Sequence, residues 1–369
     1  MLALAGASAA PCTRAVPGCT EFVTLEGGGA LRSLIYRTYS LHEKNENIRR
    51  ALVVVHGAGR DADNYFRSAT AAAFLAGGLE DTIVIAPRMA ANDGRDCKDV
   101  LAPNEVSYQC GSWRSGGPAI SNPKITSFDF LDEVLRQLAR KDVFPNLGAI
   151  VLAGHSAGGQ VVTRYAMSNR VHDRLGVPVQ YVVANPSSYA YLDDTRPAPF
   201  NDARNCTTYD EWPYGMKKRS GYTSQMTDDQ LKKQLAERPV VYLLGEIDIL
   251  PLGGFDSSCP AMAQGPTRRA RGEAYAKYVN DKFGAKHTVT VVPLCGHNGR
   301  CMFTAEVALP ILFPPQKDVG SREHADLFLV RLPLYQLNPY MIRTFNKCEA
   351  DLAAQHRSRR FSDNHAGFL

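Results

Sequence analysis

Residues 149–160 read AIVLAGHSAGGQ, and this stretch decides which fold the chain can adopt. Ala149–Ala153 is a short, continuous apolar run, which is typical of a strand buried on both faces of a sheet. Glycines stand two residues before and two residues after Ser156, and a helical pattern follows in Gln160–Asn169. The spacing predicts a strand, a tight turn with Ser156 at its tip, and a helix whose N-terminus lies at the serine hydroxyl.

Similar apolar runs recur along the chain and alternate with helical patterns. Such alternation predicts an α/β fold, with a mostly parallel, doubly wound sheet covered by helices on both faces. Glu21–Tyr39 holds two further strand-like runs around three consecutive glycines, which indicates an antiparallel hairpin. The other predicted buried strands are Ala51–His56, Thr82–Ala86, Val179–Ala184, Val240–Leu244 and Thr288–Val292.

Helices are expected between these strands. Apolar residues at helical spacing predict one helix over Phe130–Leu138, with Ser127 as its N-cap. Pro266–Phe283 has the pattern of a basic amphipathic helix, and Met302–Leu312 that of a short final one. Arg268, Arg269 and Arg271 in the basic helix are expected to be solvated or salt-bridged.

A serine hydroxyl becomes a strong nucleophile only when a base removes its proton and an acid orients that base. In a strand–turn–helix site of this kind the order along the chain is serine, acid, histidine. His297 follows the last predicted strand, in PLCGHNGRC, and is the expected base. Asp248, in LLGEIDIL, is the preferred acid, with Glu246 next and Asp193 and Asp194 as more distant alternatives.

The negative charge that develops on a carbonyl oxygen during acyl transfer must be met by N–H donors. The backbone N–H of Ala157, directly after the nucleophile, is one expected donor. The second is expected in the His56-Gly57-Ala58-Gly59 loop after an early strand, from Ala58, with Gly59 as the alternative. His56 and His155 lie too close to these backbone turns to serve as the base.

These motifs together resemble those of the α/β-hydrolase fold. HGAG after the early strand, GHSAGG at the turn and GH in the last loop are similar to secreted serine esterase-like and lipase-like hydrolases. The resemblance covers about residues 20–313. It implies an eight-stranded, mostly parallel sheet and a Ser156–Asp248–His297 triad. The cysteine-framed His297 loop, a long insertion and the tail depart from the commonest pattern.

Two segments are expected to shape substrate binding. The Gly-rich stretch Gly111–Gly117 carries Trp113, which we expect to line a pocket or, alternatively, to belong to a packed surface loop. The long polar segment 193–238 interrupts the strand–helix rhythm and holds Tyr209 and Trp212. Loops of this length are usually functional, so the segment is predicted to be a cap-like insertion, with a surface excursion as the alternative. No chemical role follows from the tail, 314–369.

Composition and charge argue against a nucleic-acid-binding protein and against a transmembrane protein. The chain has 369 residues, and its net charge of +5 comes without a concentrated basic stripe, which argues against nucleic-acid binding. No apolar run is long enough for a transmembrane helix. Met1–Ala10 resembles a truncated signal peptide, with an uncleaved N-terminal segment as the alternative, so residues 1–19 are set apart from the catalytic domain.

Nine cysteines, several in polar stretches, favour an oxidising compartment and therefore a secreted or periplasmic protein. Because the number is odd, at least one cysteine is unpaired, and Cys348 in the tail is the expected one. Cys295 and Cys301 are expected to form a disulfide around the catalytic histidine, because glycines between them let the chain close a small ring.

The sequence therefore predicts a serine hydrolase that cleaves a carboxylic ester or related acyl bond through an acyl-enzyme. A serine peptidase or an acyltransferase with the same triad remains an alternative, as does a catalytically silent binding protein of the same fold. No metal site, phosphate loop or cofactor is expected. The substrate is expected to be a small or polymeric ester, and the oligomeric state is left open.

Overall fold

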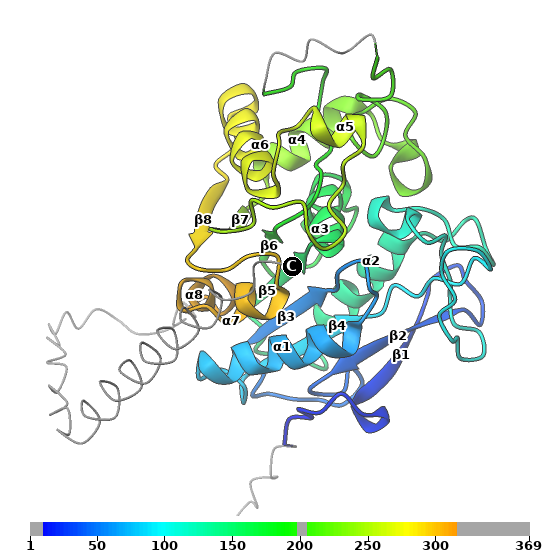
Figure 1. Cartoon of the computed structure of the whole chain (residues 1–369). Coiled ribbons are helices and arrows are strands. Elements are labelled where there is room, and N and C mark those ends of the chain that lie inside the picture. The colour runs from blue at the N-terminus through cyan, green and yellow to red at the C-terminus, as the bar shows by residue number, and fades with distance from the viewer. Residues whose placement is uncertain (1–9, 198–204, 316–369) are drawn as a thin grey trace, which may run out of the picture. The chain divides into compact units, whose positions relative to one another are not determined.

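The computed structural model describes residues 10–197 and 205–315, which form an α/β fold around one sheet (Figure 1). Eight strands lie in the order β1-β2-β4-β3-β5-β6-β7-β8. β2 pairs antiparallel with β1 and β4, and the remaining strands are parallel. The strands are β1 Thr20–Thr24, β2 Arg32–Arg37, β3 Arg50–Val55, β4 Thr82–Pro87, β5 Ala149–His155, β6 Val179–Ala184, β7 Val240–Gly245 and β8 Thr288–Val292. The predicted fold class and the hairpin are confirmed.

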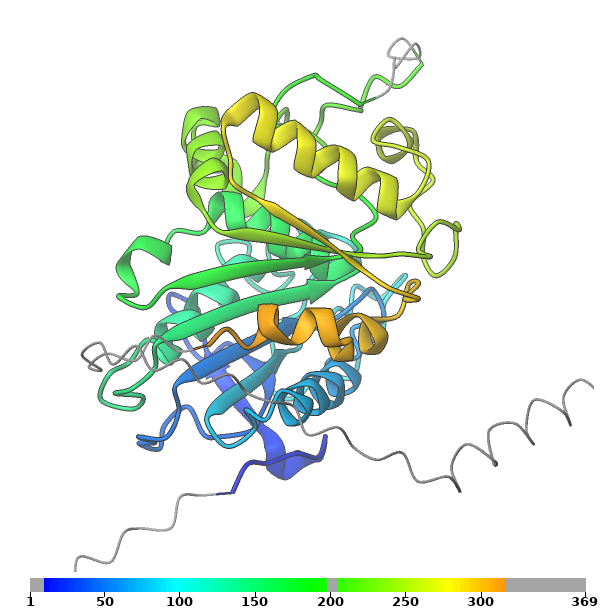
Figure 2. The ribbon, with the colours of Figure 1, turned by 90° about the vertical axis from the view of Figure 1, so that its left-hand side faces the viewer.

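Helices cover both faces of the sheet (Figure 2). α2, α3, α4 and α6 share one hydrophobic core with one face, and α1, α7 and α8 share a second core with the other. The α-helices are α1 Ala62–Leu75, α2 Ser127–Leu138, α3 Ala157–Ser168, α4 Asp228–Glu237, α5 Cys259–Met262, α6 Arg268–Phe283, α7 Gly299–Thr304 and α8 Leu309–Leu312. Short 3₁₀ turns are η1 Pro17–Cys19, η2 Ser112–Ser115, η3 His172–Arg174, η4 Gly221–Gln225 and η5 Glu306–Ala308.

The central strands are apolar along their whole length because each face meets a different helical layer. In β3, Ala51, Val53 and Val55 belong to one core, whereas Leu52 and Val54 belong to the other. β8 differs from the prediction of a buried strand. It lies at the edge of the sheet, and Thr288 and Val289 are exposed because only β7 flanks it.

Two helix predictions need correction. The N-cap of α2 is Thr126, not Ser127, because Thr126 and Asp129 form a reciprocal capping box. The hydroxyl of Ser127 instead donates to the carbonyl of Trp113. The predicted helix over Met302–Leu312 is divided into α7, η5 and α8, since the backbone of Ala305 is extended.

Eight of the nine cysteines are paired. Cys295–Cys301 is formed as predicted, with its Cα atoms 5.7 Å apart. The other three bonds are Cys12–Cys19, Cys97–Cys110 and Cys206–Cys259. Cys348, the cysteine expected to be free, lies outside the described residues, as do residues 1–9 of the signal-like segment and all of the tail beyond Pro315.

The predicted insertion 193–238 connects β6 to β7, and its described part is packed into the fold. Tyr222, Leu231 and Leu235 are buried in the core on the α3 side of the sheet. α4, in this insertion, packs against α3 and α6. The chain therefore uses this segment to extend one helical layer.

Candidate active site

Ser156 lies in the sharp turn between β5 and α3. Its φ of 58° and ψ of −118° are unusual for a residue with a side chain, and such strain is concentrated at functional sites. The flanking glycines make the turn sterically feasible. A Cβ on Gly158 would overlap the carbonyl oxygen of Val55, and one on Gly154 would overlap that of Gly158. Close packing of turn, strand and helix therefore requires glycine at both positions.

Three side chains from the carboxyl ends of β5, β7 and β8 form a chain of hydrogen bonds. The Ser156 hydroxyl lies 2.9 Å from Nε2 of His297, and Nδ1 of His297 lies 2.8 Å from Oδ2 of Asp248. Because a carboxylate only accepts, Nδ1 is the donor, which leaves Nε2 of the neutral ring to accept from the serine. Carboxyl ends of parallel strands meet at one edge of the sheet, so residues 141 positions apart come together.

The other candidate acids lie elsewhere. A carboxylate oxygen of Glu246 accepts from the backbone N–H of Leu294, 2.8 Å away, and so supports the loop before His297. Asp193 pairs with Lys282 and accepts from Tyr278, and Asp194 is exposed. Among the alternatives weighed from the sequence, the structure brings only Asp248 to the imidazole.

The second oxygen of Asp248 faces a buried arginine. Arg268 Nη1 lies 3.3 Å from Oδ1 of Asp248, and both side chains are almost fully buried. The same guanidinium donates to Ser187 Oγ at 2.8 Å and to the carbonyl of Gly253 at 2.9 Å. Burial lowers the pKa of Arg268, and the negative charge of Asp248 opposes that shift. The arginine thus connects the acid to the loop that follows it.

The sequence did not identify this role. Among the three arginines expected to be solvated or salt-bridged, only Arg269 is partly exposed, and it pairs with Glu273. Arg268 and Arg271 are wholly buried. Arg271 donates to the backbone carbonyls of Gly265, Ser187 and Asp256. Helical spacing places both arginines on the inner face of α6, and their burial becomes visible only when their partners are assembled.

His155, directly before Ser156, packs against His297. Its ring centroid lies 4.7 Å from that of His297, and its Nδ1 lies 2.8 Å from the hydroxyl of Tyr65. Burial, together with the nearby His297 ring and the positive charge of Arg268, lowers the pKa of His155 well below its usual value. His155 is therefore uncharged, and its ring packs against one face of the His297 ring and restricts its movement.

The loop after β3 approaches Ser156 from the opposite side. Ala58 is at its tip, and His56 at its base accepts from the backbone N–H of Met89 through Nε2, at 2.9 Å. Since Nε2 accepts, Nδ1 carries the proton and donates to the carbonyl of Gly57, 2.8 Å away. Burial lowers the pKa of His56 to about 4, so the imidazole is neutral and holds the loop in place.

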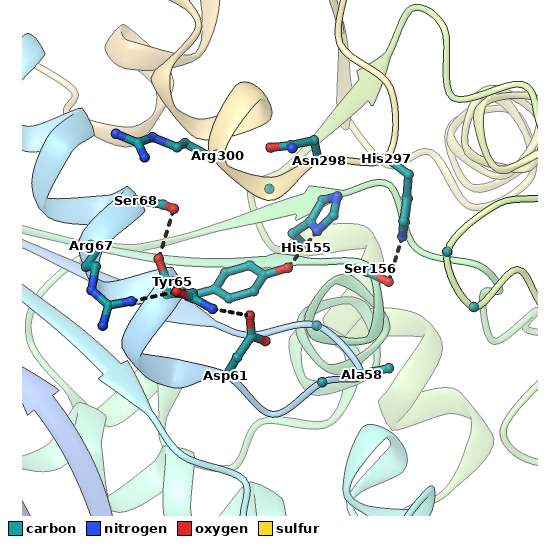
Figure 3. Close-up of a pocket in the computed structure, with 16 residues that line it drawn as sticks. Ala58, Asp61, Tyr65, Arg67, Ser68, His155, Ser156, His297, Asn298 and Arg300 are labelled. Carbon is teal, nitrogen blue, oxygen red and sulfur yellow. Dashed lines mark hydrogen bonds between the residues drawn. The ribbon is translucent and has the colours of Figure 1, made fainter. Parts of the chain in front are cut away.

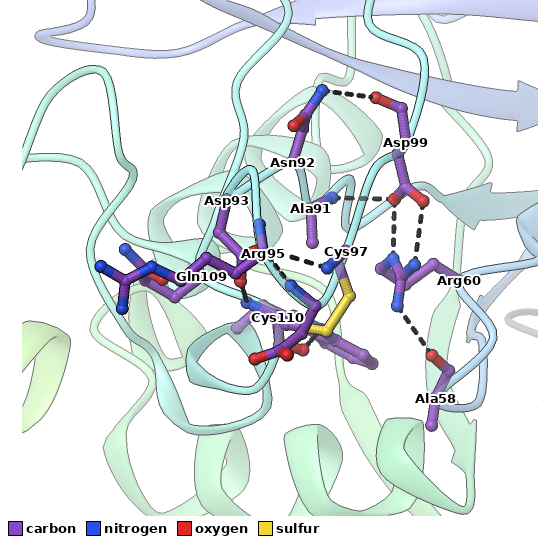
Figure 4. The surroundings of a disulfide bond; sticks show 12 residues. Ala58, Arg60, Ala91, Asn92, Asp93, Arg95, Cys97, Asp99, Gln109 and Cys110 are labelled. Carbon is purple, nitrogen blue, oxygen red and sulfur yellow. Dashed lines mark hydrogen bonds and ion pairs between the residues drawn. A yellow bond between two sulfur atoms is a disulfide. The ribbon is translucent and has the colours of Figure 1, made fainter.

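An ion pair also supports this loop (Figure 4). Arg60 donates through Nε and Nη2 to both carboxylate oxygens of Asp99, at 2.7 and 2.9 Å, and through Nη1 to the carbonyl of Ala58, at 3.0 Å. The Cys97–Cys110 disulfide closes the loop that carries Asp99. The Ala58–Gly59 peptide group, to which the Ala58 carbonyl belongs, is thus tied to a covalently closed segment.

Ser156 opens into a pocket of about 570 Å³ (Figure 3). The start of α1 contributes polar side chains to its wall, including Asp61, Tyr65 and Arg67, and Arg300 in α7 adds another charge. Gly253 and Gly254, after β7, line the side next to His297. Only 9% of Ser156 is exposed, so a ligand reaches the hydroxyl through this opening.

Comparison with known proteins agrees with the geometry. The model of the alpha/beta hydrolase family matches residues 52–308, which is more than half of the chain. This protein belongs to the alpha/beta hydrolase family. A search of curated proteins finds no match for the chain.

Solved structures show the same hydrolase fold at low sequence identity. Poly(aspartic acid) hydrolase-1 from Sphingomonas sp. KT-1 is 22% identical, with a TM-score of 0.56 over 79% of this chain and 97% of its own. LpqC, a poly(3-hydroxybutyrate) depolymerase from Bordetella parapertussis, is 23% identical, with a TM-score of 0.53 over 77% of this chain and 84% of its own.

The aromatic residues predicted to bind substrate are placed differently in this hydrolase. Trp113 is fully buried, because its ring packs against His56 and its indole N–H donates to the carbonyl of Cys110. Trp212 packs against the core and donates to the carbonyl of Ser115, and Tyr209 packs against Arg196. Within the described residues, none of the three lines the pocket at Ser156.

Neither a cluster of metal ligands nor a membrane-spanning helix is found within residues 10–197 and 205–315 of the hydrolase. This part of the chain contains no cluster of three or more histidine, cysteine or acidic side chains arranged to hold a metal ion. Of the helices described there, none is long and apolar enough to cross a membrane.

Proposed function

We propose that this alpha/beta hydrolase cleaves a carboxylic ester through Ser156, with His297 as the base and Asp248 as the acid that orients it. The observation that carries the proposal is the continuous hydrogen-bond chain from the Ser156 hydroxyl through both nitrogens of His297 to Asp248. In this arrangement the base is already within proton-transfer distance of the nucleophile.

The reaction begins when the Ser156 oxygen attacks the ester carbonyl and passes its proton to Nε2 of His297. The tetrahedral intermediate collapses as the imidazolium returns that proton to the leaving alkoxide, which departs as the alcohol. A water molecule, deprotonated by the same nitrogen, then releases the acid from the acyl-enzyme. The charge of Asp248 stabilises the imidazolium in both halves of the reaction.

The oxyanion that forms in each half needs donors near Ser156. Ala157 is the first residue of α3, so its N–H has no partner within the helix. The N–H of Ala58 is the proposed second donor, because Ala58 lines the pocket and the Gly57 carbonyl of the same peptide group accepts from Nδ1 of His56. Removing one such donor typically costs 100- to 1,000-fold in kcat.

The same catalytic groups serve a peptidase or an acyltransferase, so the ester preference is a separate part of the proposal. The two similar structures are named for poly(3-hydroxybutyrate) and for poly(aspartic acid), which are an ester and an amide polymer. We place the ester first, because an alkoxide can leave without prior protonation, whereas the nitrogen of an amide must be protonated before its C–N bond breaks.

The proposed location is a secreted or periplasmic compartment. Four disulfides support it, since such bonds persist under oxidising conditions and are rare in reducing ones.

A panel of chromogenic esters of graded acyl length, assayed beside peptide anilides, tests the proposal. We expect turnover of at least one ester, at a kcat/KM well above that of every anilide, and none by Ser156→Ala. Faster cleavage of an anilide would favour the peptidase. A wild-type chain that binds esters but turns over no member of the panel would favour a silent binding protein.

A further inference from the structure

The loops that follow β7 and β8 carry a group of exposed aliphatic side chains beside His297. Five of the thirteen large hydrophobic side chains exposed among the described residues are found on these two loops, and each is at least half exposed. Contiguous apolar surface of this kind marks binding sites in soluble proteins. We call these five residues the apolar rim: Ile247, Ile249, Leu250, Leu252 and Leu294.

The two loops lie side by side because hydrogen bonds join them. The N–H of Ile247 donates to the carbonyl of Cys295 at 3.1 Å, and the N–H of Leu294 donates to a carboxylate oxygen of Glu246. The rim also continues into the pocket. Leu252 precedes Gly253, which lines the pocket, and a Cβ built on that glycine would lie 3.3 Å from the His297 ring.

Leu294 has the least favourable conformation in the rim. Its φ is 57°, in the left-handed region that asparagine and glycine tolerate better than a bulky residue, and 80% of its surface is exposed. Neither the backbone conformation nor the exposed side chain stabilises the fold. Leu294 therefore has an unfavourable backbone conformation and an apolar side chain in water, three residues before His297. We take this combination as a sign that the side chain contacts a ligand.

The charge distribution indicates which ligand the rim fits. Residues 249–255 and 289–296 contain no charged side chain, and the two carboxylates that flank Ile247 are bonded to the N–H of Leu294 and to His297. The pocket wall from α1 and α7 is polar by contrast, with Asp61, Arg67 and Arg300. The pocket therefore has a polar wall from α1 and α7, and the uncharged segments that carry most of the rim adjoin its other lining residues, Gly253 and His297.

We propose that the apolar rim binds an aliphatic chain attached to the scissile ester, so that the enzyme selects esters with a chain longer than acetyl or ethyl. This inference rests on the proposed function and adds the substrate class. The chain is part of either the acid or the alcohol. Each methylene that moves from water onto the rim raises kcat/KM by up to about fourfold.

Two ester series identify which half of the substrate carries the chain. One varies the acid from 4-nitrophenyl acetate to octanoate, and the other varies the alcohol from ethyl to octyl acetate, all below their solubility limits. In the wild type we expect kcat/KM to rise with chain length in one series. Leu294→Asn should lower kcat/KM about fivefold to tenfold for the long ester of that series and change it less than twofold for the short one.

Leu294→Asn also separates binding from folding, because asparagine suits the backbone at this position. Its thermal midpoint should equal or exceed that of the wild type. Leu75→Asn is the matched control, since Leu75 is 55% exposed at the far end of α1 and should leave both series unchanged. The double variant Leu250→Ser with Leu252→Ser alters the loop after β7 and should lower kcat/KM for the long ester in the same way.

The proposal is overturned if kcat/KM of the wild type does not depend on chain length, or if both rim variants show the same dependence as the wild type. Turnover of the short esters in that case would leave the proposed function intact. A wild-type dimer that Leu294→Asn converts to a monomer, with unchanged kinetics on long esters, would instead make the rim a subunit contact. If no ester is turned over, the proposed function itself fails and this inference fails with it.

Discussion

The buried arginine behind Asp248 provides the most informative perturbation of the site. Replacing Arg268 by methionine keeps most of the side-chain volume and removes the charge and three hydrogen bonds, to Asp248, Ser187 and Gly253. Removing one partner of a buried ion pair typically costs about 3–5 kcal/mol, because the other charge stays buried without compensation. Arg268→Met should therefore lower the free energy of unfolding by about that amount.

Catalysis should suffer in a way that a general loss of stability does not produce. Without the arginine, Asp248 keeps its bond to His297 but loses the contact that fixes its second oxygen. Misplacement of a catalytic group by about 1 Å can cost about 100-fold, so we expect kcat to fall about 10- to 100-fold. Loss of a nearby positive charge also favours the imidazolium, so the acid limb of the kcat/KM profile should move to higher pH.

The assay compares pH profiles of kcat/KM with urea unfolding for three variants. Arg271→Met is the matched control, because Arg271 is equally buried in the same helix and donates to backbone carbonyls instead of Asp248. It should lose stability without moving the acid limb. Arg268→Lys keeps the charge and should restore the position of the limb. An equal displacement in Arg271→Met, or none in Arg268→Met, would refute the reasoning.

Three further predictions concern single carboxylates. Asp248→Asn should lower kcat by about 10⁴-fold with the fold intact, and Glu246→Gln by far less; a reversed order in steady-state assays would make Glu246 the acid. Asp99→Asn should lower kcat about tenfold or more at nearly unchanged KM, because Arg60 loses the partner that holds it against the Ala58 carbonyl, in the peptide group directly after the proposed donor; an effect on KM alone would contradict this. Burial raises the pKa of Asp132 to about 6, from about 3.8 when unfolded, so the folded state holds this proton more tightly. The stability contributed by Asp132 is therefore greatest below about pH 4 and falls by about 3 kcal/mol as the pH rises to 6. Asp132→Asn should remove that slope, and equal slopes in urea titrations of both proteins from pH 4 to 7 would disprove it.

The parts of the fold that could be predicted are those determined by short stretches of sequence. The apolar runs and the glycines around Ser156 act locally, since a buried parallel strand and a strained turn each need particular residue types. His297 and Asp248, which the structure brings together with Ser156, could be picked out because chain order and strand ends restrict where a base and an acid can lie. The Cys295–Cys301 bond was predictable for a similar reason, as its ring is short.

The errors arose where a residue's role depends on distant partners. An aromatic residue in a Gly-rich stretch can line a pocket or fill a core, and Trp113 became core because the ring of His56 lies against it. Arg268 is salt-bridged, which was one of the two expected alternatives, but its burial was not predicted, because Asp248, Ser187 and Gly253 come together around its guanidinium only in the folded chain. Spacing along the sequence contains no information about such assembled partners.

The central claim is that Ser156 is the nucleophile of the site. Incubation with a fluorophosphonate, followed by intact-mass and peptide mass spectrometry, tests this claim most directly. The account predicts one adduct on the wild-type chain, located on Ser156, and no adduct on Ser156→Ala. A wild-type chain that stays unlabelled, or a Ser156→Ala chain labelled at the wild-type rate, would contradict it.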